Sequence, residues 1–360
     1  MRKIHLANTD VEFELAQASH PPFEQQWSRH SLCLQLQFLP LLYADSQDFV
    51  AVTRYPTKDY LIDLEQILQT KLPPLVLISN PQVPENYLCL PWGHSPQVQR
   101  WTAQWNIDYP HPSNWTLLKE IHSKAFSYQF TPLPQTTLIG DFAQLQQWIE
   151  KTPGPKVLKS CYGLSGQGNR QFNSDVLPHD FLKFCTKEWQ AGRPLIAEPW
   201  LERVEDFSTQ WWIHPSQEIE WLGSTRFQTN AKGVYQGTMA GSEEVLFPSF
   251  WSHLQQHKQH ANQALQKIAQ LGYFGPIGID AFIYHHNQEL LLYPIVEINP
   301  RQTFSSVALC LQKRLAPQHT LQLSFFTGEQ SISPSLLPAS LLNDQGKLIE
   351  FHRRLTIQIN

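Results

Sequence analysis

The stretch Gly278-Ile279-Asp280-Ala281-Phe282, followed further along the chain by Val296-Glu297-Ile298-Asn299-Pro300-Arg301, decides the fold. Both runs read as strands on either side of a polar turn, because each is rich in apolar residues with isolated polar positions. Residues two apart on a strand share a face, so Glu297 and Asn299 project together. If the two runs pair as an antiparallel hairpin, Asp280 meets them on that face.

Asp280, Glu297 and Asn299 would then form a set of hard oxygen ligands. This set suits Mg²⁺, which takes one or two carboxylates and completes its octahedron with water and phosphate oxygens. Two carboxylates placed so close together repel one another unless a cation lies between them. The alternative is an ordinary hairpin with a polar, solvated face.

A glycine-rich segment, Lys159 to Gly168, directly follows the strand-like run Lys156 to Lys159. Glycines let backbone N–H groups approach phosphate oxygens, and Lys159 can neutralise their charge. No Gly-Lys-Ser/Thr follows, and Asn169 to Phe172 looks extended, so neither a P-loop nor a dinucleotide-binding turn is expected. Taken alone, the segment could equally be a simple loop.

The segment Glu198-Pro199-Trp200-Leu201 follows the apolar run 195–197 and precedes Glu205 and Asp206. Such a strand end can offer backbone hydrogen bonds to an adenine edge and carboxylates to ribose hydroxyls. A solvated acidic turn explains the acidic residues equally well.

Two further groups of side chains need interpretation. Arg226 and Lys232 flank a segment rich in Thr, Asn, Gln and Gly, where a basic residue can steer an anionic substrate; the alternative is surface charge.

His253, His257 and His260 lie on a Gln-rich amphipathic helix. This pattern favours a solvated helical face over a role in metal binding or general-base catalysis.

The order of these features resembles that of the ATP-grasp superfamily over roughly residues 115 to 310. The segment 223–237 is most similar to a poorly characterised bacterial branch of it. The ribose position departs from the family, since it holds Asp rather than the commoner Glu. The resemblance implies metal binding by Asp280, Glu297 and Asn299, and a catalytic role for Arg301 near the transferred phosphate. Arg226 is the second catalytic candidate, because of the polar segment that it flanks. The implied nucleotide contacts come from Lys124 (with Lys119 as a competing candidate), Lys159, Ser165, Gly166, Gly168, Glu198, Trp200, Leu201 and Asp206.

The resemblance implies an α/β (α+β) fold, in which two α+β subdomains clasp ATP after a small α/β N-terminal domain. Alternating strand and helix signals before residue 110 agree with such an N-terminal unit. Proline blocks helix continuation, so the proline-rich stretch Tyr109 to Asn114 is the expected hinge. We therefore expect an N-terminal domain at 1–112, a small subdomain with the glycine-rich loop at 113–200 and a large subdomain with the magnesium site at 201–360.

The implied activity is an ATP-dependent ligase that uses one or two Mg²⁺ ions, forms an acyl phosphate from a carboxylate and condenses it with an amine. A kinase on the same scaffold and a non-catalytic nucleotide-binding protein are the alternatives. The net charge is −4 and the sequence contains no Lys/Arg run, so small-molecule or peptide substrates are expected rather than nucleic acid. Five scattered cysteines and no apolar run of membrane-spanning length favour a cytoplasmic protein; the oligomeric state stays open.

Overall fold

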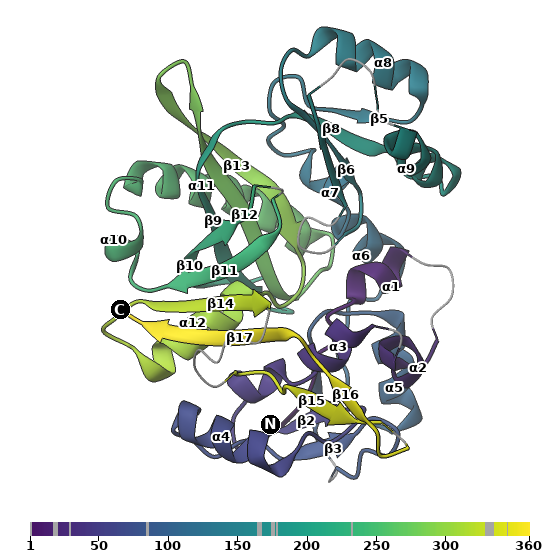
Figure 1. Cartoon of the computed structure of the whole chain (residues 1–360), viewed down its shortest axis with the longest axis vertical. Helices are drawn as coiled ribbons and strands as arrows, with labels where there is room; N and C mark the ends of the chain where they lie inside the picture. Colours follow the sequence, from purple (N-terminus) through teal and green to yellow (C-terminus); the bar gives the residue numbers. More distant parts are fainter. Residues whose placement is uncertain are drawn as a thin grey trace. The chain divides into compact units, whose positions relative to one another are not determined.

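The structure of the chain is a computed structural model that divides into two compact units. It describes all residues except 1, 17–20, 29, 84–85, 164–167, 174–176, 178, 232, 328–334 and 344. Unit 1 comprises Met1–Trp115, Gln236–Leu246 and Arg301–Asn360, and unit 2 comprises Thr116–Tyr235 and Phe247–Pro300. The chain therefore passes between the units more than once (Figure 1).

Unit 1 contains a four-stranded parallel sheet in the order β3-β2-β1-β4. The alternating signals before residue 110 are the apolar runs at 49–52 and 75–78 and the helix-like stretch at 60–68, and these form β2, β3 and α4. The short apolar runs are buried on this sheet, as expected for strands with crossover helices. Its elements are β1 (Lys3–Leu6), β2 (Phe49–Val52), β3 (Leu75–Leu77), β4 (Leu88–Pro91), α1 (Val11–Ala16), α2 (Phe23–Ser28), α3 (Ser31–Leu36), η1 (Leu39–Leu42), α4 (Lys58–Leu68) and α5 (Pro96–Gln104).

The C-terminal segment of the chain belongs to unit 1. Leu321 and Leu355 are fully buried in the same apolar core as Ile4 and Leu6 of β1, which explains this grouping. Residues 301–360 thus group with the N-terminal part of the chain. The expected domain boundaries at 112 and 200 stay a prediction. The added elements are the antiparallel strands β11 (Tyr235–Ala240), β14 (Leu321–Thr327) and β17 (Arg353–Ile359), the hairpin β15 (Ser340–Leu342) and β16 (Leu348–Glu350), and the helices α10 (Glu243–Leu246) and α12 (Phe304–Leu315).

Glu14 on α1 is a buried acid that should make the stability of the protein depend on pH. Its side chain is 2% exposed and accepts a hydrogen bond from the Gln97 backbone N–H at 2.9 Å. Burial raises its pKa from 4.5 to about 7, and the neighbouring Asp10 carboxylate adds to the rise.

The pKa of Glu14 is higher in the folded protein than in the unfolded chain. Its contribution to the free energy of unfolding is therefore complete below pH 4.5 and is lost as the pH rises through 7. A shift of this size corresponds to about 3 kcal/mol in the free energy of unfolding. We expect Glu14→Gln, which keeps the acceptor oxygen, to remove this loss between pH 4.5 and 7 in urea titrations. The exposed Asp63→Asn on α4 is the control; an unchanged pH slope in Glu14→Gln would contradict the prediction.

Unit 2 contains a four-stranded antiparallel sheet in the order β5-β8-β6-β7. Two helices pack on it through a core that includes Leu145, Leu158 and Cys185. Asp141 caps the first of these helices by accepting from the Gln144 N–H at 2.8 Å, as its place before the apolar run predicts. The elements are β5 (Thr137–Ile139), β6 (Lys156–Ser160), β7 (Asn169–Phe172), β8 (Leu195–Pro199), α8 (Phe142–Lys151) and α9 (His179–Gln190).

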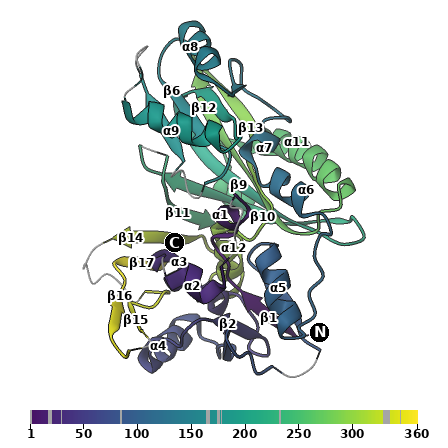
Figure 2. The ribbon, with the colours of Figure 1, turned by 90° about the vertical axis from the view of Figure 1, so that its right-hand side faces the viewer.

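The second sheet of unit 2 is antiparallel, in the order β13-β12-β9-β10. The long helix α11 lies against it, next to β13 (Figure 2). The sequence of 115–126 favours a single helix, but the structure has two, because the Ser123 side chain caps a new short helix by accepting from the Ala125 N–H. The elements are β9 (Arg203–Ile213), β10 (Ile219–Thr229), β12 (Gly275–His286), β13 (Glu289–Asn299), α6 (Trp115–Ile121), α7 (Lys124–Ser127) and α11 (Trp251–Gln270).

Among the described residues, no helix is both long and apolar enough to cross a membrane.

Candidate functional site

The predicted hairpin is present and carries the three proposed metal ligands. Strands β12 and β13 pair antiparallel, with Asp280 opposite Glu297 and Gly278 opposite Asn299. Asp280 and Glu297 are partly buried, whereas Asn299 is 5% exposed. The arrangement therefore brings the two carboxylates and the amide to one region of the sheet.

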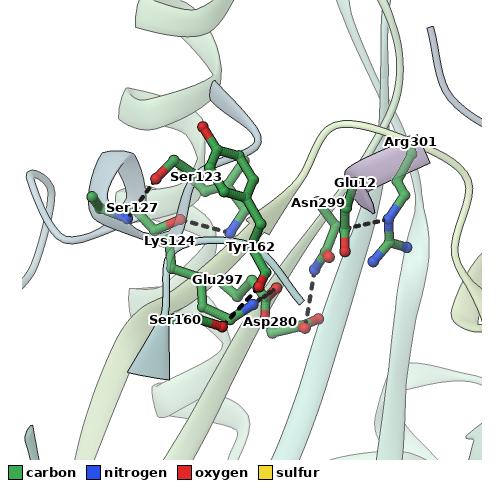
Figure 3. A network of polar contacts seen from close by, with 12 residues as sticks. Glu12, Ser123, Lys124, Ser127, Ser160, Tyr162, Asp280, Glu297, Asn299 and Arg301 are labelled. Carbon is green, nitrogen blue, oxygen red and sulfur yellow. Dashed lines mark hydrogen bonds and ion pairs between the residues drawn. The ribbon is translucent and has the colours of Figure 1, made fainter. Parts of the chain in front are cut away.

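Each carboxylate in this region has a partner, and the partner of Glu297 is one that the residue pattern did not reveal. The Asn299 Nδ2 donates to Asp280 Oδ2 at 3.1 Å, and the Lys124 ammonium on α7 forms an ion pair with Glu297 Oε1. Both contacts appear in Figure 3, where Lys124 and Glu297 point toward one another. The ammonium supplies positive charge beside two acids that would otherwise repel one another.

The chemistry of this donor set fits Mg²⁺. Within the described ranges no cluster of three or more His, Cys, Asp or Glu side chains could hold a metal ion. Two carboxylates and one amide form a smaller oxygen set, and Mg²⁺ is commonly bound by one or two carboxylates while water and phosphate oxygens complete its shell. Asp280 and Glu297 can supply those carboxylates, with Lys124 as the group that a cation at Glu297 would displace.

A second buried ion pair lies on the other sheet of unit 2. Lys159 of β6 pairs with Glu198 of β8, and the side chains of both are 6% exposed. The Tyr293 hydroxyl from β13 donates to the other oxygen of Glu198 at 3.2 Å, and burial raises the pKa of this tyrosine. The lysine expected to meet nucleotide phosphates thus lies beside the acid expected at the adenine hinge.

The glycine-rich segment returns to the strand from which it leaves. The Ser160 N–H donates to the Gly168 carbonyl at 3.2 Å, so the two ends of the loop meet. A Cβ on Gly168 would lie 2.1 Å from Ser160 Oγ, whereas one on Gly163 would meet only ordinary contacts from 3.5 Å outward. Ser165 and Gly166, predicted to contact phosphates, lie outside the described residues.

This asymmetry predicts different effects for two similar glycine substitutions. Gly168→Ala should displace the Ser160 hydroxyl from its 2.7 Å hydrogen bond to the Tyr162 carbonyl and destabilise the protein by about 1–2 kcal/mol. Gly163→Ala is the matched control and should change the free energy of unfolding little.

Adding Ser160→Ala to Gly168→Ala should recover part of the loss, because it removes the clashing oxygen. Chemical denaturation of the three variants checks this, and equal effects of the two single substitutions would contradict it.

The segment predicted to contact adenine and ribose runs from the end of β8 into β9. The Trp200 N–H donates to the Pro155 carbonyl at 2.8 Å, and the Arg203 guanidinium lies 5.0 Å from the centre of the Trp200 ring. Asp206 accepts from Arg203 at 2.9 Å and from the Thr229 hydroxyl at 3.3 Å. Trp200 and Leu201 are partly buried, and the nucleotide roles of this segment stay predictions.

The two arginines predicted to be catalytic are both paired with acids. Arg226 on β10 forms an ion pair with Glu205, whose pKa is raised by burial and partly lowered again by this arginine. Arg301 belongs to unit 1, where its Nε donates to Glu12 Oε1 at 2.7 Å (Figure 3). Lys232 lies outside the described residues.

One prediction about the histidines is wrong. His257 is fully buried rather than on a solvated face: its Nδ1 lies 2.7 Å from the Pro294 carbonyl and its Nε2 lies 2.7 Å from Thr209 Oγ1. His253 and His260 on the same helix are partly exposed. The spacing of Leu254, Ala261 and Leu265 around position 257 could have indicated the buried stripe.

Sequence reasoning also missed partners that come from other elements. Ser127 Oγ on α7 accepts from the Ile298 N–H at 2.9 Å and so ties α7 to β13 between Glu297 and Asn299. Tyr293 likewise contacts a predicted site residue, Glu198. No local signal marks Ser127 or Tyr293, because their contacts depend on the packing of distant segments.

Comparisons with known proteins place the fold. No family model matches the chain. It is 30% identical over 148 residues to the [Butirosin acyl-carrier protein]–L-glutamate ligase of Niallia circulans, a match that covers 41% of this chain and 33% of that protein. The chain thus spans about a third of the length of this relative.

Solved structures match over more of the chain at lower identity. The ADP complex of purK, an N5-carboxyaminoimidazole ribonucleotide synthetase, superposes with a TM-score of 0.52 at 13% identity, covering 99% of this chain and 91% of that one. The biotin carboxylase domain of the Hydrogenobacter thermophilus 2-oxoglutarate carboxylase superposes with a TM-score of 0.50 at 12% identity, covering 93% and 77%. Both neighbours are ATP-grasp proteins. The chain therefore has the ATP-grasp fold, as the order of its motifs predicts.

Proposed function

We propose that this protein is an ATP- and Mg²⁺-dependent ligase that activates a carboxylate and joins it to an amine. The observation that carries the proposal is the pairing of Asp280 with Glu297 across β12 and β13, with Asn299 hydrogen-bonded to Asp280. A non-catalytic protein has no need to keep two acids opposite one another on a partly buried surface. The ATP-grasp fold supports a nucleotide as the partner of this site.

In this proposal each side chain has a distinct task. ATP would supply the phosphoryl group, and Mg²⁺ would neutralise its phosphate oxygens. Asp280 and Glu297 would hold the cation, and Lys124, released from Glu297, would be able to meet phosphate oxygens. Arg226 and Arg301 carry the proposed charge stabilisation, for which each would have to turn from its present acid.

The proposed reaction proceeds in two steps. A substrate carboxylate oxygen attacks the γ-phosphorus of ATP, so that an acyl phosphate forms and ADP leaves. An amine then attacks the acyl carbon, loses a proton and expels phosphate, which leaves an amide. Water has to be excluded during the second step, because it would hydrolyse the acyl phosphate.

The Niallia circulans relative suggests which substrates to test first. That protein is named as a ligase of L-glutamate and an acyl-carrier protein, which supports amino acids and their carriers as the first compounds to test. Small-molecule or peptide carboxylates and amines are the proposed partners.

The test is incubation of the purified chain with ATP, Mg²⁺ and pools of amino acids and small acids. ADP release and the mass of any condensation product are followed, with the amine omitted in a parallel reaction. The proposal expects ADP, phosphate and an amide in equal amounts. A phosphorylated product that accumulates without any amine would indicate a kinase instead, and no ADP with any pool would count against catalysis.

A further inference from the structure

The pairing of Asp280 with Glu297 depends on an irregularity in the hairpin. Near the turn, Phe282 lies opposite Tyr293 and His286 opposite Glu289, which is a regular antiparallel register. Continued without change, this register would place Asp280 opposite Ile295. Instead the register shifts after Phe282, and Asp280 lies opposite Glu297.

The shift is a bulge that gives β13 two more residues than β12. Pro294, Ile295 and Val296 lie between Tyr293 and Glu297, whereas Ala281 alone lies between Phe282 and Asp280. An even number of added residues keeps the alternation of faces, so Glu297 still shares a face with Asp280. The bulge therefore decides which residue lies opposite Asp280. It does not change which residues of β13 share the polar face, so the alternation of side chains along the strand still predicts that face.

The buried histidine of α11 holds the first residue of this bulge. His257 Nδ1 lies 2.7 Å from the carbonyl oxygen of Pro294, and the side chain is fully buried. Its Nε2 lies 2.7 Å from Thr209 Oγ1, and the Trp211 Nε1–H donates to the same hydroxyl oxygen at 3.0 Å. One tautomer satisfies all three contacts: Nδ1–H donates to Pro294, and the Thr209 hydroxyl donates to Nε2.

We infer that His257 is a positioning residue for the proposed magnesium site: by binding the Pro294 carbonyl it fixes the bulge that places Glu297 opposite Asp280. This inference rests on the proposed function, but it names a residue on the opposite face of the sheet from the metal ligands. The depressed pKa of His257, about 4 because of burial, agrees with a neutral ring that keeps one N–H for Pro294. Without such a donor the partly buried Pro294 carbonyl would lose this hydrogen bond, which favours a return to the regular register.

His253 offers a matched control on the same helix and the same strand. Its Nε2 lies 3.2 Å from the Leu290 carbonyl, in the part of the hairpin where the register is regular. If His257 only anchored α11 to β13, its replacement would lower stability without changing the register or the Mn²⁺ affinity, and the more exposed His253 would show the same pattern to a smaller degree. A histidine that sets the register matters at position 257 alone.

Two variants of His257 separate its two hydrogen bonds. Asn places an amide N–H where Nδ1 lies and can still donate to Pro294, whereas Gln reaches toward Thr209 and leaves the carbonyl. We expect His257→Gln to weaken binding of Mn²⁺ in the presence of ADP about tenfold or more, the size typical for groups that orient a metal ligand. His257→Asn and His253→Gln should stay within about threefold of the unsubstituted protein.

The register itself is read by NMR, independently of metal or activity. Cross-strand contacts between Asp280 and Glu297 should be present in the unsubstituted protein and in His257→Asn, and lost in His257→Gln. Nitrogen-15 spectra of the unsubstituted protein should show the Nδ1–H tautomer of His257. The Nε2–H tautomer, or a His257→Gln protein that keeps both the register and the Mn²⁺ affinity, would overturn the inference.

Failure of the proposed function would look different. In that case the unsubstituted protein would bind neither Mn²⁺ with ADP nor ATP, while the histidine tautomer and the register would still follow the pattern above. The tautomer is measured on the unsubstituted chain, so the inference remains testable even where a substitution at this buried position prevents folding.

Discussion

Glu297→Gln is expected to lower ADP release from ATP by about 10²-fold or more while the protein stays folded. Gln keeps the size of the side chain but removes the negative charge that would bind Mg²⁺, and with it the partner of the Lys124 ammonium. The backbone pairing of β12 with β13 does not use this side chain, so the sheet should persist. ADP release is measured with a coupled assay, and the fold is checked by circular dichroism and thermal unfolding.

The control for Glu297→Gln is Glu289→Gln on the same strand. Glu289 lies opposite His286 at the exposed end of the hairpin, and its neutralisation changes the net charge by the same amount. ADP release should therefore be unchanged in Glu289→Gln. Normal turnover in Glu297→Gln would remove the metal role of this residue from the proposed mechanism.

The hairpin was predictable because its signal is local. Strand 278–284, the polar turn and strand 290–298 follow from composition and alternation, and the structure confirms them as β12 and β13. The common face of Asp280, Glu297 and Asn299 follows from the two-residue period of a strand. The bulge at Pro294 was not predictable, because it depends on a donor from α11 that is distant in the sequence.

The partners of the site residues were hidden for a similar reason. Lys124 meets Glu297, and Lys159 meets Glu198, through pairings between separate elements that no spacing rule specifies. The interrupted helix at Ser123 could have been anticipated, since serine is a common N-cap, but the apolar pattern continues past it. The position of 301–360 in unit 1 depends on the shared core with β1, which periodicity cannot reveal.

Lys159→Met is expected to destabilise the protein as well as weaken nucleotide binding. The glycine-rich loop alone suggests a lysine whose loss affects chiefly ATP affinity. In the structure, however, Lys159 neutralises Glu198, and both side chains are 6% exposed. Removing one partner of a buried ion pair leaves an uncompensated charge, which costs about 3–5 kcal/mol. Urea denaturation should show this loss, while the exposed Lys151→Met on α8 should change the free energy of unfolding little.

The double variant Lys159→Met with Glu198→Gln separates the two roles of Lys159. Gln keeps the oxygen that accepts from the Tyr293 hydroxyl, but it carries no charge that needs an ammonium. We therefore expect the double variant to regain most of the lost stability, because neither side of the former pair is left charged. Its affinity for ATP, measured by calorimetry, should stay low if Lys159 also meets the phosphates. Recovery of both stability and ATP affinity would mean that Lys159 serves the fold of unit 2 and that another cation, with Lys124 the first to test, binds the nucleotide.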